Sequence, residues 1–153
     1  MKPKKLDNID EKIINELILD AKIPLRELAI KLSVSFVTIM NRIKKLEKEK
    51  VIKNYTTIVD YDKLDYSVNV LIEIRIAKGK LFELEKKISK SKNVYAVYDT
   101  TGEYDATVLA KFKSTRQMDD FLKMIQTYDF VERTNTKLIL NTIKNSQIMI
   151  WQL

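Results

Sequence analysis

The chain has 153 residues, 45% of them hydrophobic and 32% charged, which is enough apolar material for one ordinary domain or two small ones. It contains neither cysteine nor histidine, which excludes disulfides, thiolate zinc sites and histidine-dependent catalysis. The formal net charge of +7 favours association with polyanions. No apolar run is long enough to span a bilayer and no signal-peptide pattern is present, so the sequence indicates a cytoplasmic protein. Because the commonest metal ligands, cysteine and histidine, are missing, we expect no bound metal.

Residues 1–53 carry the periodicity of three helices. The first has an expected N-cap at Asp7 and apolar residues at helical spacing: Ile9, Ile13, Ile14, Leu17 and Ile18. Pro24 suits the first position of a second helix, whose inward face is Leu25, Leu28, Ala29 and Leu32. Ser35 is the expected N-cap of a third helix from about Phe36 to Glu49, with an apolar stripe of Phe36, Ile39, Ile43 and Leu46.

The period changes to two after this segment, which indicates strands. Residues 54–67 form an expected linker with a short strand over 54–61, and residues 68–153 form a second domain. Within that domain the pattern predicts a strand over 68–77, a helix over 80–91, two strands around Gly102, a helix over 114–126 and a long strand over 131–144. We therefore expect an α+β protein with an N-terminal three-helix domain and a C-terminal β-α-β-β-α-β, ferredoxin-like domain.

The polar turn Ser33-Val34-Ser35 joins a short helix to a longer basic one, which is the pattern of a helix-turn-helix. At 100° per residue, the side of the third helix opposite its apolar stripe carries Val37, Met40, Asn41, Lys44, Lys45 and Lys48. Asn41 has an amide that can hydrogen-bond adenine, and Val37 and Thr38 carry methyl groups suited to thymine. The lysines and Arg42 can neutralise phosphates. The expected DNA-binding residues are Ser35, Val37, Thr38, Asn41, Arg42, Lys44, Lys45 and Lys48. The alternatives are an ordinary solvated lysine-rich face and a protein-binding helix-turn-helix.

These motifs resemble the Lrp/AsnC (feast/famine) family of transcription regulators. The resemblance begins with Leu6-Asp7, Asp10 and Asp20-Ala21-Lys22, and continues with Glu27-Leu28-Ala29, with Ser35, Ile39, Arg42 and Leu46, and with Val51-Ile52. In the second half, the family's Gly-x-Tyr-Asp stands as residues 102–105 and its Arg-Thr-x-Thr as residues 133–136. These motifs span essentially the whole chain, and their order and spacing together make the resemblance specific.

The chain departs from the family pattern at several positions. Lys50, Asn54 and Asp65 stand where the family usually has glycine, and such positions commonly need a positive φ. A lysine tolerates that conformation poorly, so the end of the third helix can be closed differently here. Phe36 is large for the start of a recognition helix and is expected either to pack inward or to contact the DNA edge.

The resemblance implies dimers that pair through their sheets and assemble further into octamers, and hence double-stranded DNA with two half-sites as the partner. It also implies an amino-acid effector and no other cofactor, bound at the contact between dimers near the turn of residues 102–105. On chemical grounds Asp105 can pair with the ligand's ammonium group, Gly102 lets its carboxylate approach backbone N–H groups, and Thr134 and Thr136 can donate hydroxyls. The expected effector-binding residues are Gly102, Tyr104, Asp105, Thr134 and Thr136. The alternative for these residues is a tight turn that only builds a hairpin. Two alternative functions stay open: a small-molecule-sensing or interaction module without specific DNA binding, and an enzyme. Asp99, Glu103 and Asp105 are explained by strand alternation and an exposed turn, so we expect no catalytic residue.

Overall fold

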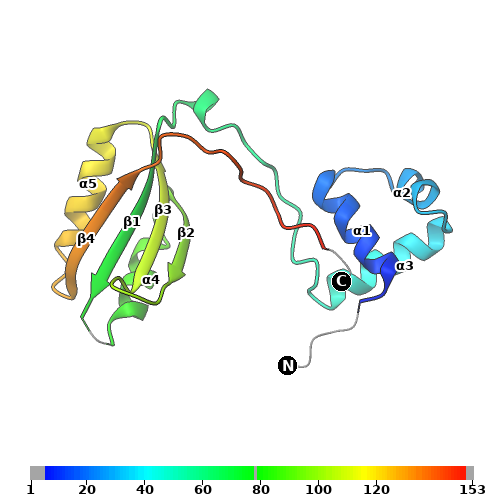
Figure 1. The fold of residues 1–153 in the computed structure, drawn as a ribbon, viewed down its shortest axis with the longest axis horizontal. Coiled ribbons are helices and arrows are strands. Elements are labelled where there is room, and N and C mark those ends of the chain that lie inside the picture. Colours follow the sequence, from blue (N-terminus) through cyan, green and yellow to red (C-terminus); the bar gives the residue numbers. More distant parts are fainter. Residues whose placement is uncertain (1–5, 78, 151–153) are drawn as a thin grey trace. The chain divides into compact units, whose positions relative to one another are not determined.

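The computed structural model describes residues 6–77 and 79–150, which form two compact units (Figure 1). Among the described residues, the helical unit comprises 6–58 together with 144–150, and the sheet unit comprises the described part of Val59–Ile143. The second boundary differs from the expected domain of residues 68–153, because the C-terminal residues join the helical unit. No helix in the described part of the chain is long and apolar enough to cross a membrane.

The helical unit contains α1 (Asn8–Leu19), α2 (Leu25–Lys31) and α3 (Phe36–Lys48). Asp7 is the N-cap of α1, and its carboxylate accepts the backbone N–H groups of Ile9 and Asp10. Pro24 is itself the N-cap of α2, one position before the expected one. The three helices bury one core, whose fully buried members are Ile13, Leu28, Ile39 and Leu46. Each such side chain contributes about 1.5–3 kcal/mol relative to exposure.

The C-terminal segment of the described chain is attached to α1 through Asn15. The side-chain amide of Asn15 donates to the carbonyl of Ile150 and accepts from its N–H, at 2.7 Å each. Ile150 also packs against the core of the helical unit. A side-chain amide that satisfies both backbone groups of one residue reproduces the pairing of a strand partner. This attachment explains why the final residues belong with the helices.

The sheet unit confirms the expected β-α-β-β-α-β order. A short 3₁₀ helix, η1 (Asp62–Leu64), precedes β1 (Val68–Ile76), α4 (Leu81–Ile88), β2 (Val94–Asp99), β3 (Ala106–Phe112), α5 (Thr115–Gln126) and β4 (Val131–Leu138). The four antiparallel strands lie in the order β2-β3-β1-β4. Leu84 and Ile88 of α4 and Phe121 and Ile125 of α5 share one core with alternate residues of β1, so both helices cover the same face of the sheet (Figure 1).

Two expected strands differ from the structure. Residues 54–61 form no strand, and the final strand ends at Leu138 rather than at 144. Alternating side chains indicate that a segment can form a strand, but a strand also needs a neighbour to satisfy its backbone groups. Within the described residues no other segment pairs with 54–61 as a ladder, so alternation alone overestimated the extent of the strands.

The register of the sheet decides which side chains share a face, because residues directly opposite in an antiparallel pair point to the same side. Ile72 on β1 lies opposite Thr136 on β4, and Glu73 lies opposite Asn135. Thr134 and Thr136 are therefore on the face that the helices cover. Arg133, Asn135 and Lys137 are on the other face, called here the open face.

Candidate nucleic-acid interface

The turn between α2 and α3 is closed by backbone hydrogen bonds that force a left-handed residue. The N–H of Val34 donates to the carbonyl of Ala29, and the N–H of Ser33 donates to that of Ile30. This is the Schellman pattern, which requires the residue after the helix cap to have positive φ. Ser33 meets the requirement with φ of 55°. The turn thus ends α2 and places Ser35 directly at the start of the next helix.

Ser35 is the N-cap of α3, as the sequence predicts. Its Oγ accepts the backbone N–H of Thr38 at 3.0 Å and lies 2.8 Å from the Oγ1 of Thr38. Satisfying a free N–H group at a helix start in this way is worth about 1 kcal/mol. The two hydroxyls are therefore already engaged with each other, and Thr38 presents its methyl group beside them.

The two faces of α3 differ as its spacing predicts. Ile39, Ile43 and Leu46 are buried in the core, whereas Val37 is 56% exposed. Asn41 and the lysine row of Lys44, Lys45 and Lys48 are exposed. A shallow hollow on this surface is lined by Asn41, Lys44, Lys45, Lys48 and Glu49. One amide and three ammonium groups on one helical face suit a base edge flanked by phosphates.

Phe36 does not join the apolar stripe of α3. Its side chain is 43% exposed, and the stripe begins at Ile39. Phe36 is the first residue of α3 and is not among the side chains that pack in the core of the helical unit. Of the two expectations for this residue, inward packing is wrong, and Phe36 stands at the rim of the exposed surface.

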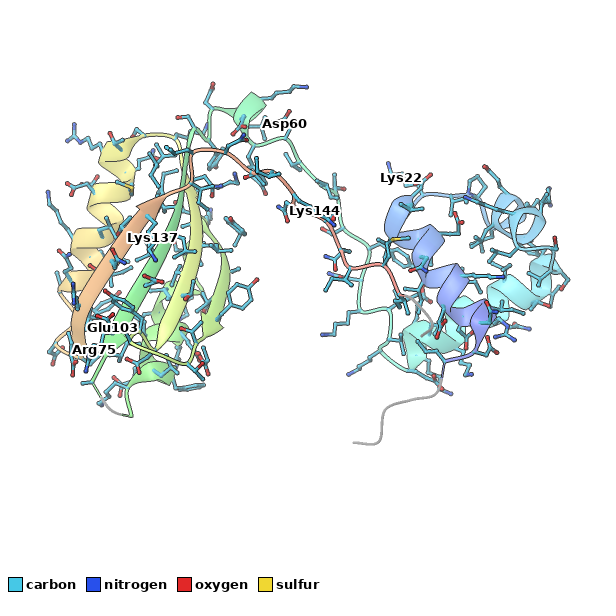
Figure 2. The ribbon with its side chains drawn as sticks, viewed as in Figure 1. Lys22, Asp60, Arg75, Glu103, Lys137 and Lys144 are labelled. Carbon is cyan, nitrogen blue, oxygen red and sulfur yellow. The ribbon has the colours of Figure 1, made fainter. Side chains whose placement is uncertain are left out.

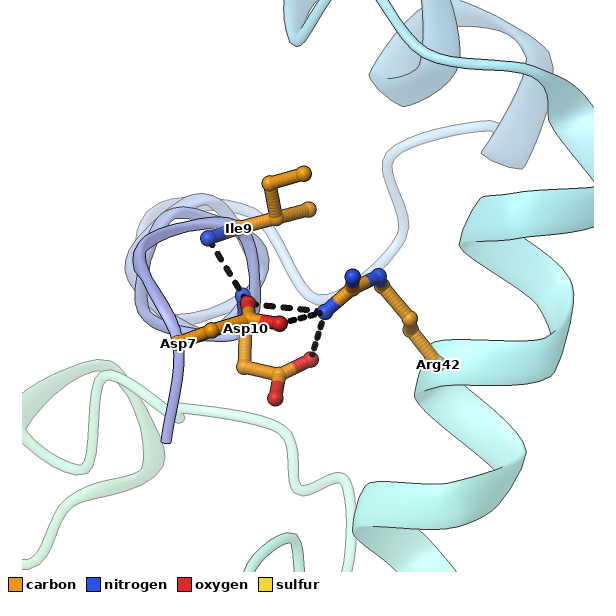
Figure 3. A network of polar contacts seen from close by, with 4 residues as sticks. All are labelled: Asp7, Ile9, Asp10 and Arg42. Carbon is orange, nitrogen blue, oxygen red and sulfur yellow. Dashed lines mark hydrogen bonds and ion pairs between the residues drawn. The ribbon is translucent and has the colours of Figure 1, made fainter. Parts of the chain in front are cut away.

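Arg42 is held by two carboxylates of the helix start opposite it (Figure 3). Its Nη1 donates to Asp7 Oδ1 and Oδ2 at 2.7 and 2.6 Å and to Asp10 Oδ1 at 2.8 Å. Asp10 is only 1% exposed, so it is a buried charge that Arg42 pairs. The hydrogen bond from Arg42 holds the pKa of Asp7 below its usual value, and the bonds to Asp7 and Asp10 raise the pKa of Arg42.

This network ties α3 to the start of α1 and was missed by sequence reasoning. Asp7 and Asp10 were noted only for capping and family resemblance, and Arg42 for phosphate contact. The signal that could have found it is a charged residue on the border of an apolar stripe, since such a residue needs a partner when the helix packs. Contact of Arg42 with phosphate stays a prediction for its remaining N–H groups.

The end of α3 is closed with Lys50 in the position that the family usually gives to glycine. The N–H of Val51 donates to the carbonyl of Leu46 and that of Lys50 to Glu47, so the Schellman pattern of α2 is repeated. Lys50 occupies the left-handed position with φ of 56°, and Asp65 in the linker has φ of 64°. Asn54 is not among the residues with positive φ. The helix closes as a glycine would close it, at the cost of an unfavourable lysine conformation.

The residues expected to bind an effector are distributed over both faces of the sheet unit. Tyr104 lines an open hollow of about 540 Å³ whose other residues are Glu73, Thr100, Thr101, Glu103, Thr107, Arg133, Asn135 and Lys137. Figure 2 marks Glu103 and Lys137 on this unit. Thr134 and Thr136 do not line the hollow, because the register turns them to the helix-covered face, where Gln126 donates to Thr134 Oγ1.

Asp105 has a structural partner in the turn that follows Gly102. Its Oδ2 accepts the N–H of Ile76 at 2.8 Å, while its own N–H donates to the carbonyl of Ile74. Gly102 has φ of 122°, a conformation that a side chain would disfavour. The turn is therefore fixed to β1 through Asp105.

Positively and negatively charged side chains line the hollow beside Tyr104. Glu73 accepts from Lys137 at 2.9 Å and from Asn135 at 2.8 Å, and Arg133 lies 3.3 Å from Glu103. The bond from Lys137 lowers the pKa of Glu73. Sequence reasoning missed Arg133, Asn135 and Lys137 as a set, although their alternation along β4 places them on one face.

Two family models match the chain. The AsnC-type helix-turn-helix domain matches residues 6–47, and the Lrp/AsnC ligand binding domain matches residues 69–149. An HTH-type transcriptional regulator of Pyrococcus furiosus is 44% identical over 140 residues, which cover 92% of this chain and 95% of the relative. These relatives favour DNA-binding regulation over an interaction module.

Solved structures agree with the observed architecture. The structure of Escherichia coli AsnC aligns with a TM-score of 0.89 at 26% identity, covering 96% of this chain and all of that one. A transcriptional regulator from Neisseria meningitidis, solved as its L-Met complex, aligns with a TM-score of 0.85 over 93% of this chain and 94% of that one. At 21% identity the latter shows the fold alone.

Proposed function

The chain belongs to the Lrp/AsnC family of DNA-binding transcription regulators, and from this premise we propose that its dimers recognise DNA with the outward face of α3 and respond to an amino acid bound by the sheet unit. The observation that supports DNA recognition is the exposed polar face of α3. The turn before this helix is closed by two backbone hydrogen bonds, and the opposite face of the helix is buried in the core. A recognition helix needs one face packed against its own domain, which fixes its orientation, and one exposed polar face that contacts the DNA.

The exposed residues have separate roles in this proposal. Asn41 reads a base edge, and Val37 and Thr38 contact thymine methyl groups. Lys44, Lys45 and Lys48 bind phosphates and set the position of the helix without reading sequence. Ser35 and Arg42 act mainly by fixing the start and the orientation of α3, because their polar atoms are engaged within the helical unit.

The first experiment is selection of a binding site from a random DNA pool, followed by fluorescence anisotropy over a series of salt concentrations. We expect a selected sequence with two related half-sites and a steep loss of affinity with salt. Weak binding to all sequences alike, lost at physiological salt, would contradict the proposal and favour a sensing module.

Two single variants then test the division of roles along α3. Asn41→Ala should cost about 1–3 kcal/mol on the selected site and little on random DNA. Lys45→Ala should weaken binding to both DNAs equally and flatten the salt dependence. Identical behaviour of the two variants would show that these roles are wrongly assigned.

The open face of the sheet supports dimer formation. Leu71 and Leu109 are neighbours across β1 and β3 on this face and are only partly buried, with the Glu73–Lys137 pair beside them. An apolar centre with a charged border is the composition of a protein interface. We propose that two chains pair here, which gives two recognition helices for two half-sites. Assembly of dimers into an octamer is the further step that the family resemblance suggests.

The effector proposal rests on the turn of residues 102–105 and on the match to a ligand binding domain. An amino acid needs a carboxylate for its ammonium group and N–H or cationic donors for its carboxylate. Asp105 offers Oδ1, and Gly102 leaves the backbone N–H groups of the turn approachable. Binding of L-Met by the Neisseria regulator makes an amino acid the first ligand class to examine.

Thermal-shift and calorimetric measurements with the standard amino acids test this proposal. Asp105→Asn keeps an oxygen for the N–H of Ile76 but removes the charge, so it should abolish binding of the active amino acid while the fold is retained. Asp120→Asn, which neutralises an exposed carboxylate of α5 outside the hollow, is the matched control and should retain binding. If no amino acid raises the melting temperature of the full chain, the effector proposal fails and the DNA proposal is unaffected.

A further inference from the structure

The positive charge of this chain is concentrated in two places. Residues 1–53 contain thirteen lysines and arginines and eight acidic residues. Residues 78–92 contain six lysines and two glutamates, which gives a net +4 within the short segment around α4. The rest of the chain has nine cationic and eleven acidic side chains. The sheet unit is therefore not uniformly basic, and its surplus lies on a single helix and its flanks.

The lysines of this segment project from the surface. Lys86, Lys87, Lys90 and Lys92 are exposed, and no ion pair joins any of them to a carboxylate within the described residues. Lys80 is neutralised by Glu83, at 2.5 Å. We call Lys86, Lys87 and Lys90 the α4 patch, because these three line one hollow together with Glu83 and Tyr128.

One lysine of the α4 patch is positioned by a neighbouring aromatic ring. The Nζ of Lys87 lies 4.1 Å from the centre of the Tyr128 ring, and Tyr128 stacks on Phe130 with ring centres 5.5 Å apart. An aromatic ring below the ammonium group restrains the position of the lysine, and the positive charge is not neutralised as it would be in an ion pair with a carboxylate. Leu84 and Ile88 anchor the inner side of α4 in the core, so the helix itself is a fixed support. Lys86 and Lys87 lie in the last turn of α4, where their charges also suit the helix macrodipole, whereas Lys90 lies beyond the end of the helix.

The covalent connection to the helical unit determines which polyanion the patch meets. Residues 54–67 span at most about 50 Å when fully extended, which is roughly 15 base pairs of DNA. Once α3 is bound to its site, the α4 patch is therefore kept near the flanking duplex at a high effective concentration. Charge complementarity and this tether select the phosphate backbone of the same DNA molecule.

We propose that the α4 patch is a second, sequence-independent DNA-contact surface that binds phosphates flanking the site recognised by α3. It rests on the proposed function for the site contact and extends it to the sheet unit. Each lysine that contacts a phosphate releases a counterion, so the patch adds to affinity and to salt dependence but not to sequence preference. Its contribution exists only where DNA extends beyond the half-sites.

The test compares a short duplex that carries only the selected half-sites with a duplex extended by about 20 base pairs on each side. The variant is the full chain with Lys86→Gln, Lys87→Gln and Lys90→Gln. We expect wild type to bind the long duplex more tightly and with a steeper salt slope than the short one. The variant should bind the long duplex roughly 10-fold or more weakly than wild type, and its salt slope should be shallower by about one for each lysine that no longer binds a phosphate. It should bind the short duplex as wild type does.

Two control variants make the result specific. Lys63→Gln, Lys113→Gln and Lys123→Gln remove the same charge from exposed positions of the sheet unit outside the patch and should leave long-duplex binding unchanged. Replacement of the three patch lysines by arginine keeps the charge and should retain the binding. Equal affinity and salt slope of wild type and the Gln variant on the long duplex would overturn the inference. Loss of wild-type binding to the short duplex would instead overturn the recognition role of α3.

Discussion

The helical unit and the sheet unit differ in how directly their sequences reveal a functional surface. On α3, residues three and four apart share a face, so the exposed Asn41 and the lysine row follow from spacing within one element. In the sheet unit the expected effector residues come from a turn and from a strand whose register is set by β1. Tyr104 and Thr136 consequently lie on opposite faces. A site built on one helix is visible in the sequence, and a site built across strands depends on register.

The largest expected effect separates the two faces of α3. Ile39→Ala removes a fully buried side chain and should lower the free energy of unfolding of the helical unit by about 2–5 kcal/mol. Val37→Ala, on the exposed face, should change that free energy by less than about 0.5 kcal/mol and lower DNA affinity instead. Hydrogen exchange of the full chain measures the two units separately. A similar stability loss in both variants would show that Val37 packs against other residues.

The next effect concerns the ion pairs behind α3. Arg42→Met keeps an apolar stem of similar length but leaves Asp10 buried without its partner, which should cost about 1–3 kcal/mol of stability in the helical unit. Exchange rates in the sheet unit should not change. Replacing both Arg42 and Asp10, by Met and Leu, should recover part of the loss because no buried charge is then left unpaired, and Asp7, which also loses Arg42, is exposed to water. A double variant less stable than the single one would contradict this explanation.

In the sheet unit, the register can be tested through the effector. Tyr104→Phe removes a hydroxyl at the hollow of the open face and should weaken binding of the active amino acid by about 10-fold, as expected for one lost hydrogen bond. Thr136→Val, nearly the same size, alters the helix-covered face and should leave binding within about twofold. Calorimetry on both variants gives the comparison. The reverse result would place the effector on the helix-covered face, beside Thr134 and Thr136.

A smaller, stabilising effect is expected at the end of α3. Lys50→Gly relieves a left-handed lysine and should raise the stability of the helical unit by about 0.5–1 kcal/mol. Lys45→Gly, five residues earlier and inside α3, should lower it by about 1 kcal/mol. Urea denaturation followed by circular dichroism measures both. Destabilisation by both variants would mean that the lysine side chain at position 50 makes an interaction worth more than its backbone strain.

The smallest effect is a pH dependence at Asp7. Its pKa in the folded chain is lowered from 3.8, chiefly by the hydrogen bond from Arg42, so the carboxylate stabilises the fold above that pH. The contribution is lost as the pH falls from about 4 through the lower folded-state pKa. Asp7→Asn should flatten the dependence of helical-unit stability on pH in this range, and Arg42→Met should do the same. An unchanged acid profile in Asp7→Asn would exclude this role.

Local signals were sufficient for most elements of the fold. Asp7 and Ser35 were identified as N-caps from residue type and position, and each accepts backbone N–H groups of its helix. Alternation predicted the strand over 68–77, and the alternate residues Val70, Ile72, Ile74 and Ile76 form the buried face of β1. These features depend on residues within one turn or one strand, so the sequence contains the whole cause.

Sequence alone determined the capped turn, the exposed lysine row and the β-α-β-β-α-β order, because spacing and capping act between near neighbours in the chain. Only the tertiary structure decided that Arg42 pairs with Asp10, that Ile150 is bound by Asn15 and that residues 54–61 find no strand partner. It also decided on which face of the sheet Thr136 and Asn135 lie. Each of these depends on a partner far away in the sequence, and the choice among such partners is made only when the chain packs.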